Sequence, residues 1–227
     1  MKAIDLSKIY EFFQPETVKQ RIHIIGCGSV GSTLAENLAR CGLTQFSLYD
    51  FDVVEEHNIV NQMFRQQDVN KPKVEALRDI LLEINPEIER TLELHPKGWQ
   101  GEMLSGYVFL AVDSIEIRKK FVEQHMMNPF IKAVFDIRTG LTDAQHYAAD
   151  WKNYDMKQNL LNTMDFTDEE AEAEEPVSAC GVTLGVATTV RLISALAVNN
   201  FLNFVKNGKI RKTVMLDGFE FVLHGFC

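Results

Sequence analysis

The sequence is poor in cysteine and short of basic residues. The first shortage argues against certain metal sites and disulfides, and the second against one class of partner. Its four cysteines form no Cys-x-x-Cys pair, so neither a zinc site of the paired-cysteine kind nor a disulfide framework is expected. Lysine and arginine number 23 against 32 acidic residues, which gives a net charge of −9. This balance argues against nucleic acid as the main partner, because binding a phosphate backbone needs a basic face.

Long apolar runs are also lacking. No stretch reaches the roughly 18 apolar residues of a membrane span, and the longest candidate, residues 182–205, is interrupted by Arg191. Residues 1–5 (MKAID) have no apolar core region of the kind found in signal peptides. No membrane association is therefore expected, and reduced thiols in the cytoplasm fit best. An apolar content of 46% is enough to bury one sizeable core, so residues 1–227 are predicted to form a single domain, with residues 1–20 as an N-terminal extension.

Residues 21–73 carry most of the information. An apolar run is followed by a glycine loop, an amphipathic helix pattern, a second apolar run and the acidic residue Asp50. Gly26 allows a tight turn, Gly28 lets the backbone approach a phosphate, and Gly31 lets the helix pack on the strand. The helix N-terminus then faces an anion, and Asp50 suits ribose hydroxyls. The pattern predicts a nucleotide site; the alternative is an ordinary strand-to-helix turn.

The residues around and after Asp50 indicate which nucleotide is expected. A dinucleotide dehydrogenase would usually move on to another strand and helix, whereas here Asp52, Asn58, Gln62 and Lys73 follow in order. This arrangement resembles the ThiF/MoeB/HesA-type adenylyltransferases, relatives of the ubiquitin-activating enzymes. Their pattern reads roughly GxGGxG, DxDxV, SNLxRQ and G-x-PK.

The resemblance continues downstream and covers roughly residues 20–224. An apolar strand ends in Asp113 and a serine, with Arg118 in the following helix. Residues 136–140 (DIRTG) are similar to a D-x-R-x-G strand end of the family, and residues 178–182 (SACGV) resemble the start of its C-terminal core helix. Several linked motifs in order are far more specific than any one of them.

The resemblance implies ATP and magnesium as ligands and no structural zinc. It places Lys73 and Asn58 on the phosphates and Asp113 on the metal. A lysine in the first turn of a helix is mildly unfavourable against the helix dipole, and a phosphate ligand would explain Lys73. The full set of expected nucleotide contacts is Gly26, Gly28, Ser29, Gly31, Asp50, Asp52, Asn61, Gln62 and Lys73.

Several of these residues have a purely structural alternative. Asp113 could cap the helix that follows it, and Asn58 could form a turn. Asp50 could cap the turn that follows its strand, and Asp52 could be a turn residue. Arg118 is more often a helix-surface residue than a ligand contact.

The sequence departs from the family pattern at two cations. The arginine of SNLxRQ, which usually reaches the triphosphate, corresponds to Asn61, and residues 1–20 contain no arginine to match the one that relatives lend across their dimer. Two missing cations would weaken catalysis, because each stabilises developing phosphate charge. Arg65 and Arg21 are the candidates to replace them. Ser29 stands in place of the middle glycine of GxGGxG, which is tolerable.

Cys180 and Cys27 occupy positions where a functional role has to be considered. Activating enzymes use a thiolate to take the acyl group from the adenylate, and Cys180 is the candidate nucleophile. Its position just before an apolar helix predicts a buried and inert thiol. Cys27 lies inside the glycine loop, where packing against the helix is expected.

Alternating strand and helix patterns predict a Rossmann-like α/β fold: a mostly parallel sheet with flanking helices, plus C-terminal antiparallel strands. Residues 151–178, rich in carboxylates, are expected to form a mobile acidic crossover loop, under which by resemblance the partner's C-terminal tail threads. The expected strands are 22–25, 45–50, 90–94, 107–112, 131–136, 211–216 and 219–224, the last two joined at Asp217-Gly218, and the expected helices are 29–41, 71–84, 114–127 and 180–206.

The predicted function is ATP-dependent adenylation of the C-terminal carboxylate of a small ubiquitin-like or sulfur-carrier protein, by a homodimer. One alternative is a non-catalytic ThiF-like binding subunit, which the asparagine at 61 favours. A second is an NAD-dependent oxidoreductase. It would share the glycine loop and Asp50, but it would not explain Asn58, residues 71–73 or Asp113.

Overall fold

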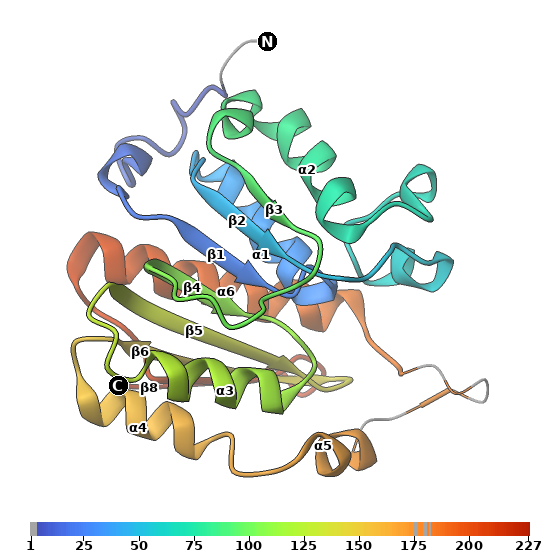
Figure 1. Ribbon diagram of the computed structural model, residues 1–227, viewed down its shortest axis with the longest axis vertical. Helices are drawn as coiled ribbons and strands as arrows, with labels where there is room; N and C mark the ends of the chain where they lie inside the picture. The colour runs from blue at the N-terminus through green and yellow to red at the C-terminus, as the bar shows by residue number, and fades with distance from the viewer. Residues whose placement is uncertain (1–3, 175–176, 179–180, 182) are drawn as a thin grey trace.

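A computed structural model describes residues 4–174, 177–178, 181 and 183–227 of the chain. Within them, one eight-stranded sheet has the strand order β3-β2-β1-β4-β5-β6-β7-β8, with helices on both faces (Figure 1). The strands are β1 (Ile22–Ile25), β2 (Phe46–Tyr49), β3 (Glu93–His95), β4 (Gly106–Leu110), β5 (Ile131–Thr139), β6 (Asp143–Asp150), β7 (Thr213–Asp217) and β8 (Val222–Phe226). The α-helices are α1 (Ser29–Arg40), α2 (Lys73–Ile84), α3 (Ile115–His125), α4 (Tyr154–Asn162), α5 (Asp168–Glu174) and α6 (Ala187–Asn207). Short 3-10 turns are η1 (Pro15–Thr17), η2 (Glu56–Val60), η3 (Gln66–Asp68) and η4 (Pro86–Arg90).

The predicted fold class is confirmed. Strands β3, β2, β1, β4 and β5 pair in parallel, and β5 to β8 pair antiparallel. Every residue of β1, β2 and β4 is buried, because α1, α2 and α6 cover one face of the sheet and α3 and α4 cover the other (Figure 1). Strands buried on both faces read as continuous apolar runs, which is why the sequence pattern identified them.

The chain order puts the candidate site at one edge of the sheet. From β1 the chain builds outward through β2 and β3, then returns to place β4 on the other side of β1. Parallel strands end at the same edge, and a crevice for ligands opens where the strand order reverses. The glycine loop follows β1, Asp50 follows β2, and Asp113 lies three residues after the end of β4.

The structure differs from the expected elements at three places. The predicted strand 90–94 is displaced to β3, because the side chain of Asn85 accepts a hydrogen bond from Glu87 N and starts η4 instead. Strand β6 was not predicted; alanines fill several of its buried positions, and alanine gives a weak strand signal. The predicted helix 180–206 begins only at Ala187.

The acidic stretch is not irregular throughout. The expected loop at 151–178 contains α4 and α5, and α4 packs on the sheet through the buried side chains of Met156 and Leu160. The sparse apolar spacing of α4 hid this helix in the sequence. Mobility of the remaining part of this stretch stays a prediction.

The C-terminal hairpin is confirmed, with a longer turn than expected. β7 and β8 pair from Asp217 with Val222, and the Asp217 carboxylate accepts hydrogen bonds from Phe219 N and Glu220 N. All five residues of β8 are exposed at the edge of the sheet. Among the described residues, no helix combines the length and the apolar character needed to cross a membrane.

A buried histidine links the sheet to α6. His146 Nε2 lies 2.9 Å from Asn200 Nδ2, and its Nδ1 lies 3.3 Å from the carbonyl oxygen of Asp136. Asn200 also bonds both the N–H and the carbonyl of Arg211, which ties α6 to the chain entering β7. Burial lowers the pKa of His146 from 6.5 to about 4.

This pKa predicts a loss of stability in mild acid. The unfolded chain takes up a proton near pH 6.5 and the folded chain only near pH 4, so stability falls as the pH drops from 6.5 towards 4. We expect His146 to account for about 2 kcal/mol of the fall in unfolding free energy between pH 7 and pH 5. Urea denaturation at both pH values, for the wild type and His146→Gln, measures it. His23, whose pKa is also lowered to about 4, contributes equally to both proteins. An equal fall in the two proteins would contradict the assignment.

Candidate nucleotide site

The glycine loop between β1 and α1 has the geometry that its three glycines predict. Gly26 has φ +92°, and a Cβ there would lie 2.6 Å from backbone atoms of Ala111 and Val112, just after β4. A Cβ on Gly31 would lie 1.8 Å from the carbonyl oxygen of Gly26. A Cβ on Gly28 would meet no atom within 4 Å. The first and third glycines are therefore required by packing, while open space lies above the second, where a ligand needs to approach the backbone.

The N-terminus of α1 is open to an anion. The helix starts at Ser29, its N-cap is Gly28, and no side chain caps it. The first N–H groups of a helix have no intrahelical partner, and the helix dipole favours negative charge near them. A phosphate group is well suited to this position.

Asp50 joins the glycine loop to the end of β2. Its Oδ2 accepts a hydrogen bond from Cys27 N at 2.6 Å and its Oδ1 from Asp52 N at 2.8 Å. Burial raises the pKa of Asp50, and the two N–H groups oppose that shift. The carboxylate is thus a structural acceptor and fixed beside the loop. Its contact with a ribose stays a prediction.

Lys73 already has an intramolecular partner. Its Nζ lies 2.8 Å from Asp52 Oδ2, and its side chain is 9% exposed. The pair is set by backbone contacts, because Val53 bridges to Pro72 and Lys73 N donates to Asp52 O. Asp52 accounts for a lysine in the first turn of α2, so this position does not by itself require a phosphate. A bound triphosphate would share or replace Asp52 as the partner.

The loop corresponding to SNLxRQ is built on Asn58. This residue is buried, and its Oδ1 accepts from Glu55 N at 2.9 Å in a reciprocal capping box, so the turn-forming role is real. Gln62 N donates to Asn58 O, and Gln62 Oε1 is buried without a hydrogen-bond partner in the described structure. Asn61 faces Gly185, where a Cβ would lie 2.4 Å from Asn61 Nδ2. The loop therefore lies against the segment that leads into α6.

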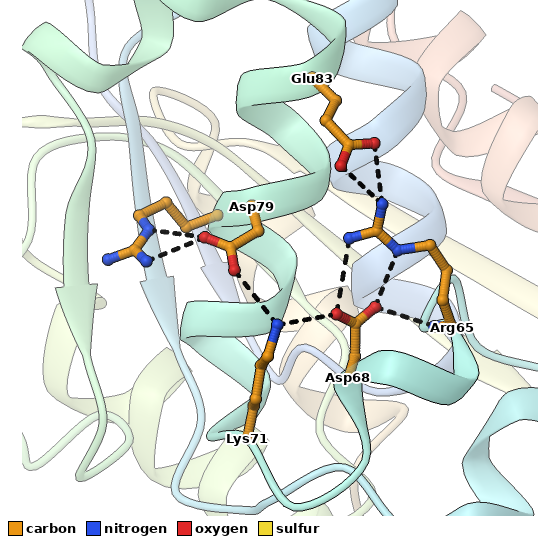
Figure 2. Close-up of polar contacts among 6 residues, drawn as sticks. Arg65, Asp68, Lys71, Asp79 and Glu83 are labelled. Atoms are coloured by element: carbon orange, nitrogen blue, oxygen red, sulfur yellow. Dashed lines mark hydrogen bonds and ion pairs between the residues drawn. The ribbon is translucent and has the colours of Figure 1, made fainter.

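Neither candidate replacement for the missing cations is placed to act as one. Arg65 pairs with Asp68 at 3.0 Å and with Glu83 at 2.7 Å, and Lys71 pairs with Asp68 and Asp79 (Figure 2). This network fixes the loop before α2 to the helix and raises the pKa of Arg65.

Arg21 lies at the other end of the sheet. It precedes β1 and donates to Phe46 O and Thr91 O, at the amino ends of the strands. The expectation that Arg21 substitutes for a triphosphate-binding arginine is therefore wrong.

Asp113 is exposed beyond the carboxyl end of β4 and does not cap α3. The N-cap is Ser114, whose Oγ accepts from Ile117 N at 3.1 Å, while Asp113 Oδ1 accepts from Ser114 N at 2.9 Å. The capping alternative for Asp113 is therefore wrong. In the described part of the chain no group of three or more His, Cys, Asp or Glu side chains gathers as a metal centre. A single exposed carboxylate such as that of Asp113 is compatible with magnesium, because magnesium commonly takes one or two protein carboxylates together with phosphate oxygens and water.

Arg118 is buried, so the expectation that it lies on the helix surface is wrong. In this arrangement its side chain also cannot contact a ligand directly. Its guanidinium donates to the carbonyl oxygens of Leu110 and Val112 and pairs with Asp136. Asp136 is also buried, and its other oxygen lies 2.6 Å from Arg138. Arg118 thus holds the turn beneath Asp113. Sequence reasoning noted residues 136–140 as a motif but missed this ion pair, for which only the D-x-R pattern was a signal.

The structure tests the expectation for Cys27 but not the one for Cys180. Cys27 is fully buried and burial raises the pKa of its thiol well above the usual value, so the expected packing role is confirmed. Cys180 lies outside the described residues. Because α6 begins seven residues after it, the argument that Cys180 packs at the start of that helix loses its basis.

Known proteins resemble this chain in sequence. The model of the ThiF family matches residues 2–221. Ubiquitin-like modifier-activating enzyme 5 of Caenorhabditis briggsae is 34% identical over 95 residues, 42% of this chain and 21% of the relative. The Oryza sativa subsp. japonica protein of the same name is 44% identical over 72 residues, 32% of this chain and 17% of the relative. The aligned regions thus span about a fifth of the length of these relatives.

Solved structures share the fold. E. coli MccB with MccA-N7isoASN has a TM-score of 0.75 at 16% identity, covering 93% of this chain and 65% of that one. A structure of MccB with ATP has a TM-score of 0.70 at 17% identity, covering 93% and 64%. PaaA has a TM-score of 0.67 at 18% identity, covering 93% and 65%.

Proposed function

The chain belongs to the ThiF family, and from this premise we propose that it uses ATP to adenylate the C-terminal carboxylate of a small ubiquitin-like or sulfur-carrier protein. The observation that carries the proposal is the carboxyl edge of the sheet. There the uncapped α1 N-terminus, the open space at Gly28, Asp50 and the Lys73–Asp52 pair lie around the end of β1. The names of the relatives support the class of substrate.

The reaction asks for little covalent chemistry from the protein. The acceptor carboxylate attacks the α-phosphorus of ATP, the bond to the pyrophosphate oxygen breaks, and an acyl-adenylate and pyrophosphate result. Positioning and charge neutralisation account for the rate of such a reaction. Asp50 fixes the ribose, α1 and Lys73 hold phosphates, and Asn58 shapes the adjoining loop. Asp113 would hold magnesium, which would supply charge neutralisation at the phosphates.

We also propose that the protein acts as a cytoplasmic homodimer. Phe51, Val53 and Val60 are 70%, 46% and 73% exposed beside Asp52 and Asn58. Large exposed apolar side chains near a site in sequence are candidates for an interface. Sedimentation of wild type and Val60→Asp tests this, and a wild type that sediments as a monomer contradicts it.

The test of the activity is ATP–pyrophosphate exchange in the presence of candidate acceptors. Exchange that requires one acceptor, is lost in EDTA and does not occur with NAD supports the proposal. The asparagine at position 61 favours a non-catalytic subunit as the second candidate. Tight nucleotide binding without exchange for any acceptor would decide for that candidate.

The thiol of Cys180 is expected to be dispensable for adenylation. Attack of a carboxylate on the α-phosphorus uses no thiol, so Cys180→Ala should keep exchange within a few-fold of the wild type. Asp113→Asn, measured in the same assay, is expected to lose exchange. Complete loss of exchange in folded Cys180→Ala would support Cys180 as a nucleophile.

A further inference from the structure

The N-terminus of α3 is occupied by a carboxylate from a distant part of the chain. Asp168, the first residue of α5, accepts hydrogen bonds from Ser114 Oγ at 2.8 Å, Ile115 N at 2.5 Å and Glu116 N at 3.3 Å. These backbone groups are donors without an intrahelical partner, and the helix dipole favours a negative charge beside them. The contact therefore joins α5 to the turn that follows β4.

The linker between α4 and α5, residues 163–167, is also held at its other end. Arg138 on β5 donates to Thr163 O at 2.7 Å and to Thr163 Oγ1 at 2.8 Å, and its guanidinium lies 5.8 Å from the Phe166 ring. Met164 is fully buried. The linker thus runs past the carboxyl ends of β5 and β4 with both ends fixed.

Ser114 connects Asp168 to the exposed carboxylate of Asp113. Its N–H donates to Asp113 Oδ1, its hydroxyl donates to Asp168 Oδ2, and the same hydroxyl oxygen accepts from Ile117 N. The rotamer of Ser114 and the path of the turn therefore depend on Asp168. Asp113 lies on that turn.

We propose that Asp168 is a positioning residue for Asp113, a role that rests on the proposed function. It fixes the turn that presents the Asp113 carboxylate to magnesium, and it adds a second negative charge bonded to the same residue, Ser114. A cation is attracted by both charges. The α4–α5 linker and the metal position of the nucleotide site are thereby coupled through Ser114 and the first turn of α3.

The test measures how nucleotide binding depends on magnesium. A fluorescent ATP analogue is titrated with MgCl2 against wild type, Asp168→Ala and Asp168→Asn. We expect both variants to need at least tenfold more magnesium for half-maximal binding, with affinity in EDTA changed less than threefold. Glu169→Gln removes the same charge from the next, exposed residue and should stay within twofold of wild type. An unchanged magnesium requirement in the Asp168 variants would overturn the proposal.

Hydrogen exchange separates this proposal from the function on which it rests. In Asp168→Ala the amides of Ile115 and Glu116 should exchange at least tenfold faster, because they lose their acceptor, while Glu169→Gln leaves them unchanged. Unchanged amides would refute the contact itself. If the amides respond but wild-type nucleotide binding is independent of magnesium, the metal assignment of Asp113 fails, and the positioning role fails with it.

Discussion

Replacing Asp113 with asparagine is expected to lower ATP–pyrophosphate exchange at least about a hundredfold, with little change in melting temperature. Asparagine keeps the shape of the side chain but removes the charge that attracts magnesium. A hundredfold loss corresponds to about 2.7 kcal/mol of transition-state stabilisation. Because Ser114 and not Asp113 caps α3, the substitution leaves the cap of the helix in place.

The measurement is exchange on purified Asp113→Asn beside its thermal unfolding. Glu116→Gln, an exposed carboxylate in the first turn of α3, is the matched control and should keep exchange near the wild-type rate. Normal exchange in Asp113→Asn would refute the metal assignment. Lost exchange with lost folding would show a structural role instead.

The second large effect is expected on stability. Asp136→Asn should lower the free energy of unfolding by about 3–5 kcal/mol, because it removes the charge that compensates two guanidinium groups. Arg118 and Asp136 are both buried, and burial lowers the pKa of Arg118. The loss of one partner leaves a buried charge unpaired.

Urea denaturation at pH 7 measures this loss. Asp143→Asn, at the exposed start of β6, is the control and should change stability by no more than about 0.5 kcal/mol. If both variants lose equally little, the ion pair with Arg118 does not stabilise the fold as described. Because Arg118 also bonds the end of β4, we expect nucleotide binding to weaken in Asp136→Asn.

The parts of the fold that the sequence predicted are those with local causes. The glycine loop is determined by contacts that a single methyl group would break, at Gly26 and Gly31, and its pattern was therefore readable. Strands β1, β2 and β4 are buried throughout and mostly apolar, because both faces of the sheet are covered. β6 was missed, since its buried positions hold small residues such as Ala144.

The parts of the site that were misread depend on residues far apart in the chain. Arg118 looks like a surface residue until β5 brings Asp136 beneath it, 18 residues later. In the sequence alone a phosphate explains Lys73, whereas in the structure the bridge between Val53 and Pro72 brings Asp52 to it. No local pattern marks such pairs, because they are products of the sheet order.

The guanidinium of Arg118 also limits the hydration of the chain between β4 and Asp113. It bonds the carbonyl oxygens of Leu110 and Val112, which at the end of a strand would otherwise be hydrated. Leu110, Ile115 and Val134, in the apolar cluster between α3 and the sheet, are buried. Asp113 therefore stands between open water on one side and a medium of low polarisability on the other. Such a low-dielectric wall screens poorly and directs the electric field of the carboxylate towards the solvent side, so a single exposed aspartate can attract a divalent cation more strongly than its exposure suggests.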